Sequence, residues 1–237
     1  MLGRVPDVIG ARLYDFAVEG IEEQDDALVG YFLDEEEARA SAAELGGASA
    51  AVEDQNWSES LQQEWRPLLV GQRFFLCPAW VEEPAPEGRI RLEMVPGNVF
   101  GGGDHATTQL CLELLETLAA PGVRIADVGC GTGILTRAAR ALGAWAVGCD
   151  IDPASAGLAD FLGSADALAP RQFDGVAVNI HLGVLRGIAA ELQRIRKPGG
   201  WLLVSGFLPE QREELAALFG KPLLFRERDG WCAALIY

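Results

Sequence analysis

Residues 91–237 alternate between short apolar runs and longer segments with helical periodicity. The strand-like runs are Val123–Val128, Ala146–Cys149, Gly175–Asn179, Trp201–Ser205, Leu223–Phe225 and Cys232–Tyr237. The helical segments between them are Leu110–Leu118, Ile134–Leu142, Val184–Ile195 and Pro209–Phe219. Because parallel strands are joined by helical crossovers, this order predicts an α/β fold with a parallel sheet that is covered on both faces. A short turn at Asp229–Gly230 separates the last two runs, which predicts an antiparallel hairpin at the end of the sheet.

The pattern in residues 1–55 is mixed and predicts a small α+β domain. Arg12–Glu19 is compatible with a strand or a helix, and Ile21–Leu33 predicts a strand pair. Asp34 precedes three glutamates and can cap a helix that ends at Gly46–Gly47. Ala48–Val52 then predicts a closing strand.

Residues 56–90 have the composition of a connector. Trp57–Trp65 shows helical spacing, and Arg73–Leu76 predicts a short strand. An exposed loop is indicated by Pro78, Pro84 and Pro86. We therefore expect a small α+β domain at 1–55, a linker at 56–90 and an α/β domain at 91–237.

The composition argues against membrane, secreted and metal-binding classes of protein. No apolar run reaches the roughly 18 residues of a membrane span, and residues 1–10 lack the pattern of a secretory signal. The five cysteines include no CxxC pair, and there are only two histidines, so we expect no metal site and a reduced, cytoplasmic protein.

The net charge of −16 bears on partners. Such a surface repels phosphate backbones, which argues against direct binding of nucleic acid. It could attract a basic protein, or it could serve solubility alone.

The clearest chemical motif is IADVGCGTG, Ile125–Gly133, where a strand runs into a glycine-rich turn. Gly129, Gly131 and Gly133 let a ligand approach bare backbone. The next strand ends at Asp150, where a carboxylate can accept hydrogen bonds from ribose hydroxyls. The spacing differs from the dinucleotide motif G-x-G-x-x-G, so S-adenosylmethionine (SAM) is favoured over a dinucleotide. A purely structural turn is the alternative.

Asn179 ends the strand in VAVNIH, on the side of the sheet where ligands bind. Its amide can accept a hydrogen bond from an amine and orient it, although an asparagine can also simply end a strand. His181 could act as a base, but a lone histidine near a loop is more often incidental.

Pro96–Thr108, PGNVFGGGDHATT, is rich in glycine and precedes a helix that Thr107 or Thr108 could cap. The segment could close over a ligand as a lid or be a solvated linker. His105 has only Asp104 beside it, so we reject a metal site there.

Together these motifs resemble the bacterial ribosomal protein L11 methyltransferase (PrmA) family. The similar segments include PGNVFGGGDHATTQLCLELLE, IADVGCGTGIL, DIDP, VNI and KPGGWLLVSG, in family order. The resemblance extends over about 56–206, with Trp57, Trp65 and Trp80 in the connector, and more loosely over 20–32.

The resemblance implies a ferredoxin-like recognition domain, a linker and a Rossmann-like SAM-dependent catalytic domain. It implies methylation of lysine side chains or the N-terminal amine of a basic ribosomal protein, without nucleic-acid or membrane partners; a monomer is expected. The implied cofactor contacts are Thr108, Gly129, Gly131, Asp150, Asn179 and Phe100, with Asp166 near the adenine amino group. Asn179 is the implied catalytic residue. Another protein or small molecule as substrate, or SAM binding without turnover, are the alternatives.

Three positions depart from the family pattern. Gly102 stands where the family has a threonine in the lid, Asp104 occupies a position that is rarely acidic, and His181 stands where an apolar or aromatic residue is usual. After Asp152 the chain is too short for a helical crossover before the strand expected at Ala159–Leu162. Either the helix has been lost or residues are missing from the chain here, and we favour the second.

Overall fold

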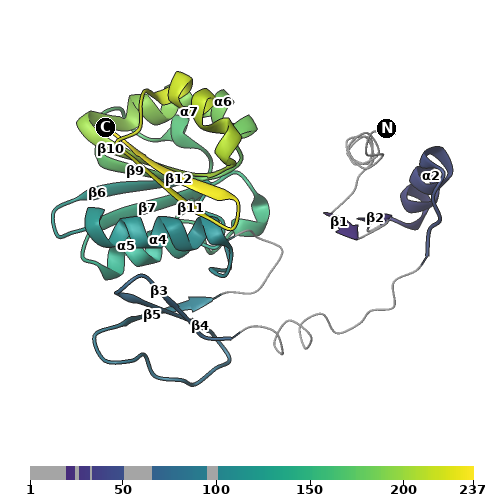
Figure 1. Ribbon diagram of the computed structural model, residues 1–237, viewed down its shortest axis with the longest axis horizontal. Coiled ribbons are helices and arrows are strands. Elements are labelled where there is room, and N and C mark those ends of the chain that lie inside the picture. Colours follow the sequence, from purple (N-terminus) through teal and green to yellow (C-terminus); the bar gives the residue numbers. More distant parts are fainter. Residues whose placement is uncertain (1–19, 25–26, 33, 51–65, 95–100) are drawn as a thin grey trace. The chain divides into compact units, whose positions relative to one another are not determined.

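The computed structural model describes residues 20–24, 27–32, 34–50, 66–94 and 101–237. The chain divides into two compact units, Met1–Ser60 and Leu61–Tyr237. Figure 1 shows their elements, and each unit is described by itself. In the described residues, no helix is long and apolar enough to cross a membrane.

The first unit contains a hairpin and a helix. Strands β1 (Gly20–Gln24) and β2 (Ala27–Tyr31) pair antiparallel, as predicted. Helix α2 (Glu35–Leu45) begins where the Asp34 carboxylate accepts hydrogen bonds from two backbone N–H groups, and it ends at Gly46 in the left-handed region. The strand expected at Ala48–Val52 is not formed by residues 48–50, and the rest of it lies outside the described residues, as does Arg12–Glu19. A ferredoxin-like domain is therefore not confirmed.

The second unit is built on a seven-stranded sheet of order β11-β12-β10-β9-β6-β7-β8. The strands are β6 (Arg124–Val128), β7 (Trp145–Asp150), β8 (Phe161–Leu162), β9 (Phe173–Asn179), β10 (Arg196–Phe207), β11 (Leu224–Arg228) and β12 (Trp231–Ile236). Strands β6 to β10 pair in parallel, and β12 is antiparallel to both of its neighbours. The predicted parallel sheet with its terminal hairpin is thus confirmed, with the last strand inserted beside β10.

Helices cover both faces of this sheet, as predicted (Figure 1). Helices α4 (Ala106–Leu118) and α5 (Ile134–Ala141) share one apolar core with β6, through residues such as Leu115 and Ile125. Helices α6 (Leu182–Ile195) and α7 (Arg212–Phe219, after the 3-10 turn η3, Pro209–Gln211) share the other core. The two cores hold the carboxyl ends of the strands in place.

Part of the expected linker is folded, which corrects the prediction for 56–90. Strands β3 (Leu68–Val70), β4 (Phe74–Pro78) and β5 (Ile90–Met94) form a separate three-stranded sheet. Phe74 and Leu76 are fully buried in the core that contains α4 and α5. The apolar run FFLC therefore stabilises the second unit, and a boundary at residue 91 would cut through β5.

The connection from β7 to β8 is short. It contains only the 3-10 turn η1 (Pro153–Ser155), followed by β8, which begins at Phe161 rather than Ala159. Asp160 holds the connection by accepting hydrogen bonds from the Arg140 guanidinium and the Gly148 backbone N–H. The structure therefore shows a crossover without an α-helix between β7 and β8, and the expectation that residues are missing from the chain here stays a prediction.

Candidate cofactor site

A cavity of about 500 Å³ opens at the carboxyl ends of β6, β7 and β9. Its lining includes Gly129, Gly131, Asp150, Ser164, Asn179 and His181. Ligands bind at this edge of open parallel sheets, and the volume suits a small organic molecule. Four predicted contact residues, Gly129, Gly131, Asp150 and Asn179, therefore meet at one site.

The glycine loop between β6 and α5 forms the floor of the cavity. The backbone N–H groups of Gly129 and Cys130 both donate to the Cys149 carbonyl on β7, which closes the turn. Gly129 has a φ of 71°, and a β-carbon there would lie 2.7 Å from the Ile180 side chain. Only glycine fits both constraints without strain.

Asp150 ends β7 beside this loop. Its Oδ2 accepts a hydrogen bond of 2.7 Å from the Gly131 N–H, and its Oδ1 accepts one of 3.0 Å from the Asp152 N–H. A carboxylate has further lone pairs, so both oxygens can still accept from a diol. The side chain is thus fixed in place for ribose hydroxyls.

Asn179 brings an unusual polar atom to the cavity. The residue is only 8% exposed, and its Nδ2 donates to the Thr108 hydroxyl at 3.4 Å. Its Oδ1 is buried without a hydrogen-bond partner in the part of the chain that the structure describes. Because a buried acceptor without a donor is costly, this oxygen is well suited to receive an N–H group of a ligand.

Thr108 acts from behind this amide. It is fully buried in the first turn of α4 and contacts Asn179 rather than lining the cavity. The structure also corrects the predicted cap of α4. His105 is the capping residue, since its Nδ1 accepts from the Thr107 N–H, and Thr107 and Thr108 lie inside the helix.

The described part of the glycine-rich segment packs against the glycine loop. Thr132 Oγ1 donates to the Gly101 carbonyl at 2.5 Å, and Gln109 Nε2 donates to the Asp104 carbonyl at 2.6 Å. Residues 101–105 are therefore held in place, unlike the solvated linker that was the alternative. Phe100, a predicted cofactor contact, lies outside the described residues.

Three rings line the cavity. The Trp231 ring lies 5.2 Å from His105, edge to face, and 6.0 Å from His181. Burial lowers the pKa of His105, and the nearby Asp104 carboxylate only partly opposes this shift. A neutral imidazole next to the cavity does not repel a cationic ligand.

Asp127 is a residue whose individual role the sequence analysis did not assign. It is 1% exposed on β6, and its Oδ2 accepts from both the backbone N–H and the hydroxyl of Thr136. Burial raises its pKa to about 6, although the bonds from Thr136 oppose the shift. An acidic residue within the apolar run IADV was the signal that could have identified it.

The structure does not bring Asp166 into the cavity. Its side chain is exposed, while the cavity lining on that side consists of Gly163 and Ser164. The Asp166 carbonyl instead accepts a hydrogen bond from Arg194 on α6. Among the described residues, no cluster of three or more potential ligands could hold a metal ion.

These features define a class. The sheet has seven strands, with an antiparallel strand inserted near one end. A glycine loop follows its first strand in the chain, and an aspartate ends its second. Together these are the features of a Rossmann-like SAM-dependent methyltransferase. The donor and acceptor set suits SAM, because Asp150 can hold ribose, the glycine loop admits close approach, and Asn179 offers an acceptor.

Comparison with known proteins defines the family. A profile described as ribosomal protein L11 methyltransferase (PrmA) matches residues 15–235. The ribosomal protein L11 methyltransferase of Synechococcus elongatus is 37% identical over 227 residues, covering 83% of this chain and 76% of its own. That of Burkholderia vietnamiensis is 37% identical over 212 residues, covering 81% and 70%.

A solved structure supports the same fold. The ribosomal protein L11 methylase of Lactobacillus delbrueckii subsp. bulgaricus aligns with a TM-score of 0.64 at 24% identity, covering 73% of this chain and 98% of that one. The chain belongs to the ribosomal protein L11 methyltransferase (PrmA) family and is a methyltransferase that uses SAM as its cofactor.

Proposed function

We propose that this protein transfers methyl groups from SAM to amino groups of ribosomal protein L11, either lysine side chains or the N-terminal amine. The names of its relatives support the substrate. The observation that carries the chemistry is the unpaired Asn179 Oδ1 at the cavity, which can accept a hydrogen bond from an amine.

In this mechanism the protein mainly positions the reactants. Bound SAM supplies a methyl group on a cationic sulfur. The glycine loop and Asp150 hold the nucleoside, while Thr108 fixes the Asn179 amide so that Oδ1 points its lone pairs at the amine. Alignment and exclusion of water then account for most of the rate enhancement. Gly131 belongs to the same contact set, and a contact by Phe100 stays a prediction.

Charge and domain organisation bear on the substrate. The net charge of −16 favours encounter with a basic ribosomal protein. We assign substrate recognition to residues 1–55 and catalysis to the following unit, acting as a monomer in the cytoplasm, where ribosomal proteins are made.

The test is methyl transfer to purified L11 from labelled SAM, with the modified amines located by mass spectrometry. Asn179→Leu keeps the side-chain volume but removes the acceptor, so kcat should fall by about 100-fold, the scale of a misplaced reacting group. SAM affinity should fall far less, because Asp150 and the glycine loop are intact. Unmodified L11 after incubation with the wild-type protein and saturating SAM would refute the proposed substrate.

A further inference from the structure

The three rings that line the cavity belong to separate elements. His105 caps α4, His181 precedes α6, and Trp231 begins β12. All three line the cavity together with Asn179, the residue proposed to receive the amine. The position of the indole therefore depends on how the β11–β12 hairpin is held against α4.

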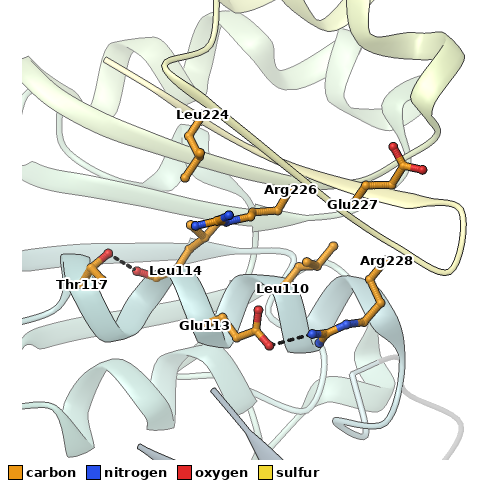
Figure 2. Close-up of a pocket in the computed structure, with 8 residues that line it drawn as sticks. All are labelled: Leu110, Glu113, Leu114, Thr117, Leu224, Arg226, Glu227 and Arg228. Carbon is orange, nitrogen blue, oxygen red and sulfur yellow. Dashed lines mark hydrogen bonds and ion pairs between the residues drawn. The ribbon is translucent and has the colours of Figure 1, made fainter. Parts of the chain in front are cut away.

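The hairpin turn is fastened to α4 by one guanidinium group. Arg228 Nη1 donates to Gln109 Oε1 and Arg228 Nη2 donates to Glu113 Oε1, both at 2.9 Å. Figure 2 shows the Arg228–Glu113 pair, with the arginine reaching from the hairpin down to the helix. A guanidinium can make both bonds at once because its donors form a planar fork.

Arg228 and Trp231 are direct partners across the hairpin, on either side of the Asp229–Gly230 turn. Paired residues of antiparallel strands project from the same face, so both side chains are directed to the α4 side of the sheet. The arginine meets the second turn of α4 and the indole meets His105 at its start. Fixing the arginine therefore fixes the indole.

Gln109 extends the connection to the glycine-rich segment. Its Oε1 accepts from Arg228, and its Nε2 donates to the Asp104 carbonyl next to His105. One amide thus joins the hairpin turn to the backbone that carries the other ring. The tie between Gln109 and Asp104 does not need Arg228, since it uses the other end of the amide.

We propose that Arg228 is a positioning residue for the methyl-acceptor side of the cavity, because it holds the Trp231 ring against His105. This inference rests on the proposed function, since it assigns the ring-lined part of the cavity to the incoming amine. Trp231 is then a specificity-determining residue that contacts the acceptor, and Arg228 acts only through it.

Arg226 provides a matched control. It lies two residues earlier on β11, lines the same surface groove between β11 and α4 as Arg228, and is drawn beside it in Figure 2. Within the described residues, its guanidinium has no hydrogen-bond or ion-pair partner. Arg226→Met is therefore the same substitution as Arg228→Met but breaks no hydrogen bond between the hairpin and α4.

The test compares Arg228→Met, Arg226→Met, Trp231→Phe and the double variant Arg228→Met/Trp231→Phe in the full chain. With L11 as acceptor, Arg228→Met should raise the acceptor KM by roughly 10-fold, the effect of losing about 1.4 kcal/mol of fixed hydrogen bonding. SAM affinity should stay within about twofold, because Gln109 still holds Asp104. Arg226→Met should match the wild type.

Non-additivity distinguishes positioning from general loss of structure. If Arg228 acts through the indole, the double variant should be no worse than the more severe single variant. Additive effects, or an unchanged acceptor KM in Arg228→Met, would overturn the proposal. Arg228→Lys keeps one of the two bonds and should give an intermediate KM.

A readout without L11 separates this proposal from the proposed function. The indole N–H resonance of Trp231 is assigned by its loss in Trp231→Phe. It should shift or broaden in Arg228→Met and not in Arg226→Met. An unmoved resonance refutes the positioning role even if L11 is methylated. If the resonance moves but L11 is not methylated, Arg228 does position Trp231. The L11 substrate is then refuted, and with it the acceptor role of the rings.

Discussion

Burial of the Asp127 carboxyl group raises its pKa to about 6, so the stability of the folded protein depends on pH through this residue beside the cofactor loop. The folded state binds this proton more tightly than the unfolded chain, whose aspartate titrates near 3.8. The stability that the protonated group contributes is therefore present below pH 4 and is lost as pH rises through 6. A shift of this size corresponds to about 3 kcal/mol.

Asp127→Asn removes this titration while an amide oxygen can still accept from Thr136. We predict that the stability difference between variant and wild type moves by about 2.5 kcal/mol in favour of the variant between pH 4 and pH 7. Urea unfolding of both proteins at the two pH values measures it, and other titrating groups cancel in the difference. A difference that stays constant with pH would show that Asp127 is already ionised at pH 4.

At this scale the sequence predicted residues that belong to local motifs. Gly129, Gly131, Asp150 and Asn179 meet at the cavity because each follows the carboxyl end of a strand that the apolar pattern made visible. The family resemblance implied Thr108 as a cofactor contact, whereas its hydrogen bond to Asn179 joins distant segments and came only from the structure. Asp166 was placed by analogy with related enzymes, but its side chain is exposed and does not line the cavity.

At the scale of elements, the turn between β6 and α5 depends on glycine for two separate reasons. Gly129 combines a φ of 71° with a β-carbon position 2.7 Å from Ile180, whereas Gly122 has a φ of 88° and open space around it. Alanine at either position carries the cost of a left-handed conformation, about 1–2 kcal/mol. Alanine at position 129 also displaces the side chain of Ile180, which lines the cavity, whereas alanine at position 122 displaces nothing.

We therefore predict that Gly129→Ala weakens SAM binding by at least about 10-fold, since displacing the loop removes more than one hydrogen bond to the ligand. Gly122→Ala should lower the melting temperature by a similar strain but leave SAM affinity unchanged. Calorimetric titration and thermal melting of both variants measure the two effects. Equal SAM affinities in the two variants would mean that the loop tolerates a β-carbon.

The sequence predicted helices and strands well where the periodicity of apolar residues extended over a whole segment. The central strands and helices alternate regularly, so their order gave the sheet and its terminal hairpin. The sheet β3-β4-β5 was missed as a unit because its strands are short and proline-flanked, and burial against α4 and α5 stabilises them rather than local pattern. The absence of an α-helix between β7 and β8 was visible only as a shortage of residues after Asp152.

For the whole molecule, both apolar cores lie in the unit Leu61–Tyr237, which therefore contains the material for its own stability. We predict that a chain lacking residues 1–60 still binds SAM with wild-type affinity but methylates L11 poorly, with kcat/KM reduced by about 100-fold or more, as expected when the recognition surface is removed. Calorimetry and the labelled-methyl assay test the two halves. Undiminished transfer would show that the first unit does not recognise the substrate.

The most direct test of the account is calorimetric titration of SAM into the wild-type protein, Asp150→Ala and Asp166→Ala. We predict tight binding to the wild type, a loss of about 1–3 kcal/mol in Asp150→Ala, as for removal of a buried hydrogen-bonding partner, and little change in Asp166→Ala, whose carboxylate is exposed. Absence of SAM binding to the wild-type chain would mean that the shortened crossover after Asp152 has disabled the site, and would contradict the methyltransferase account.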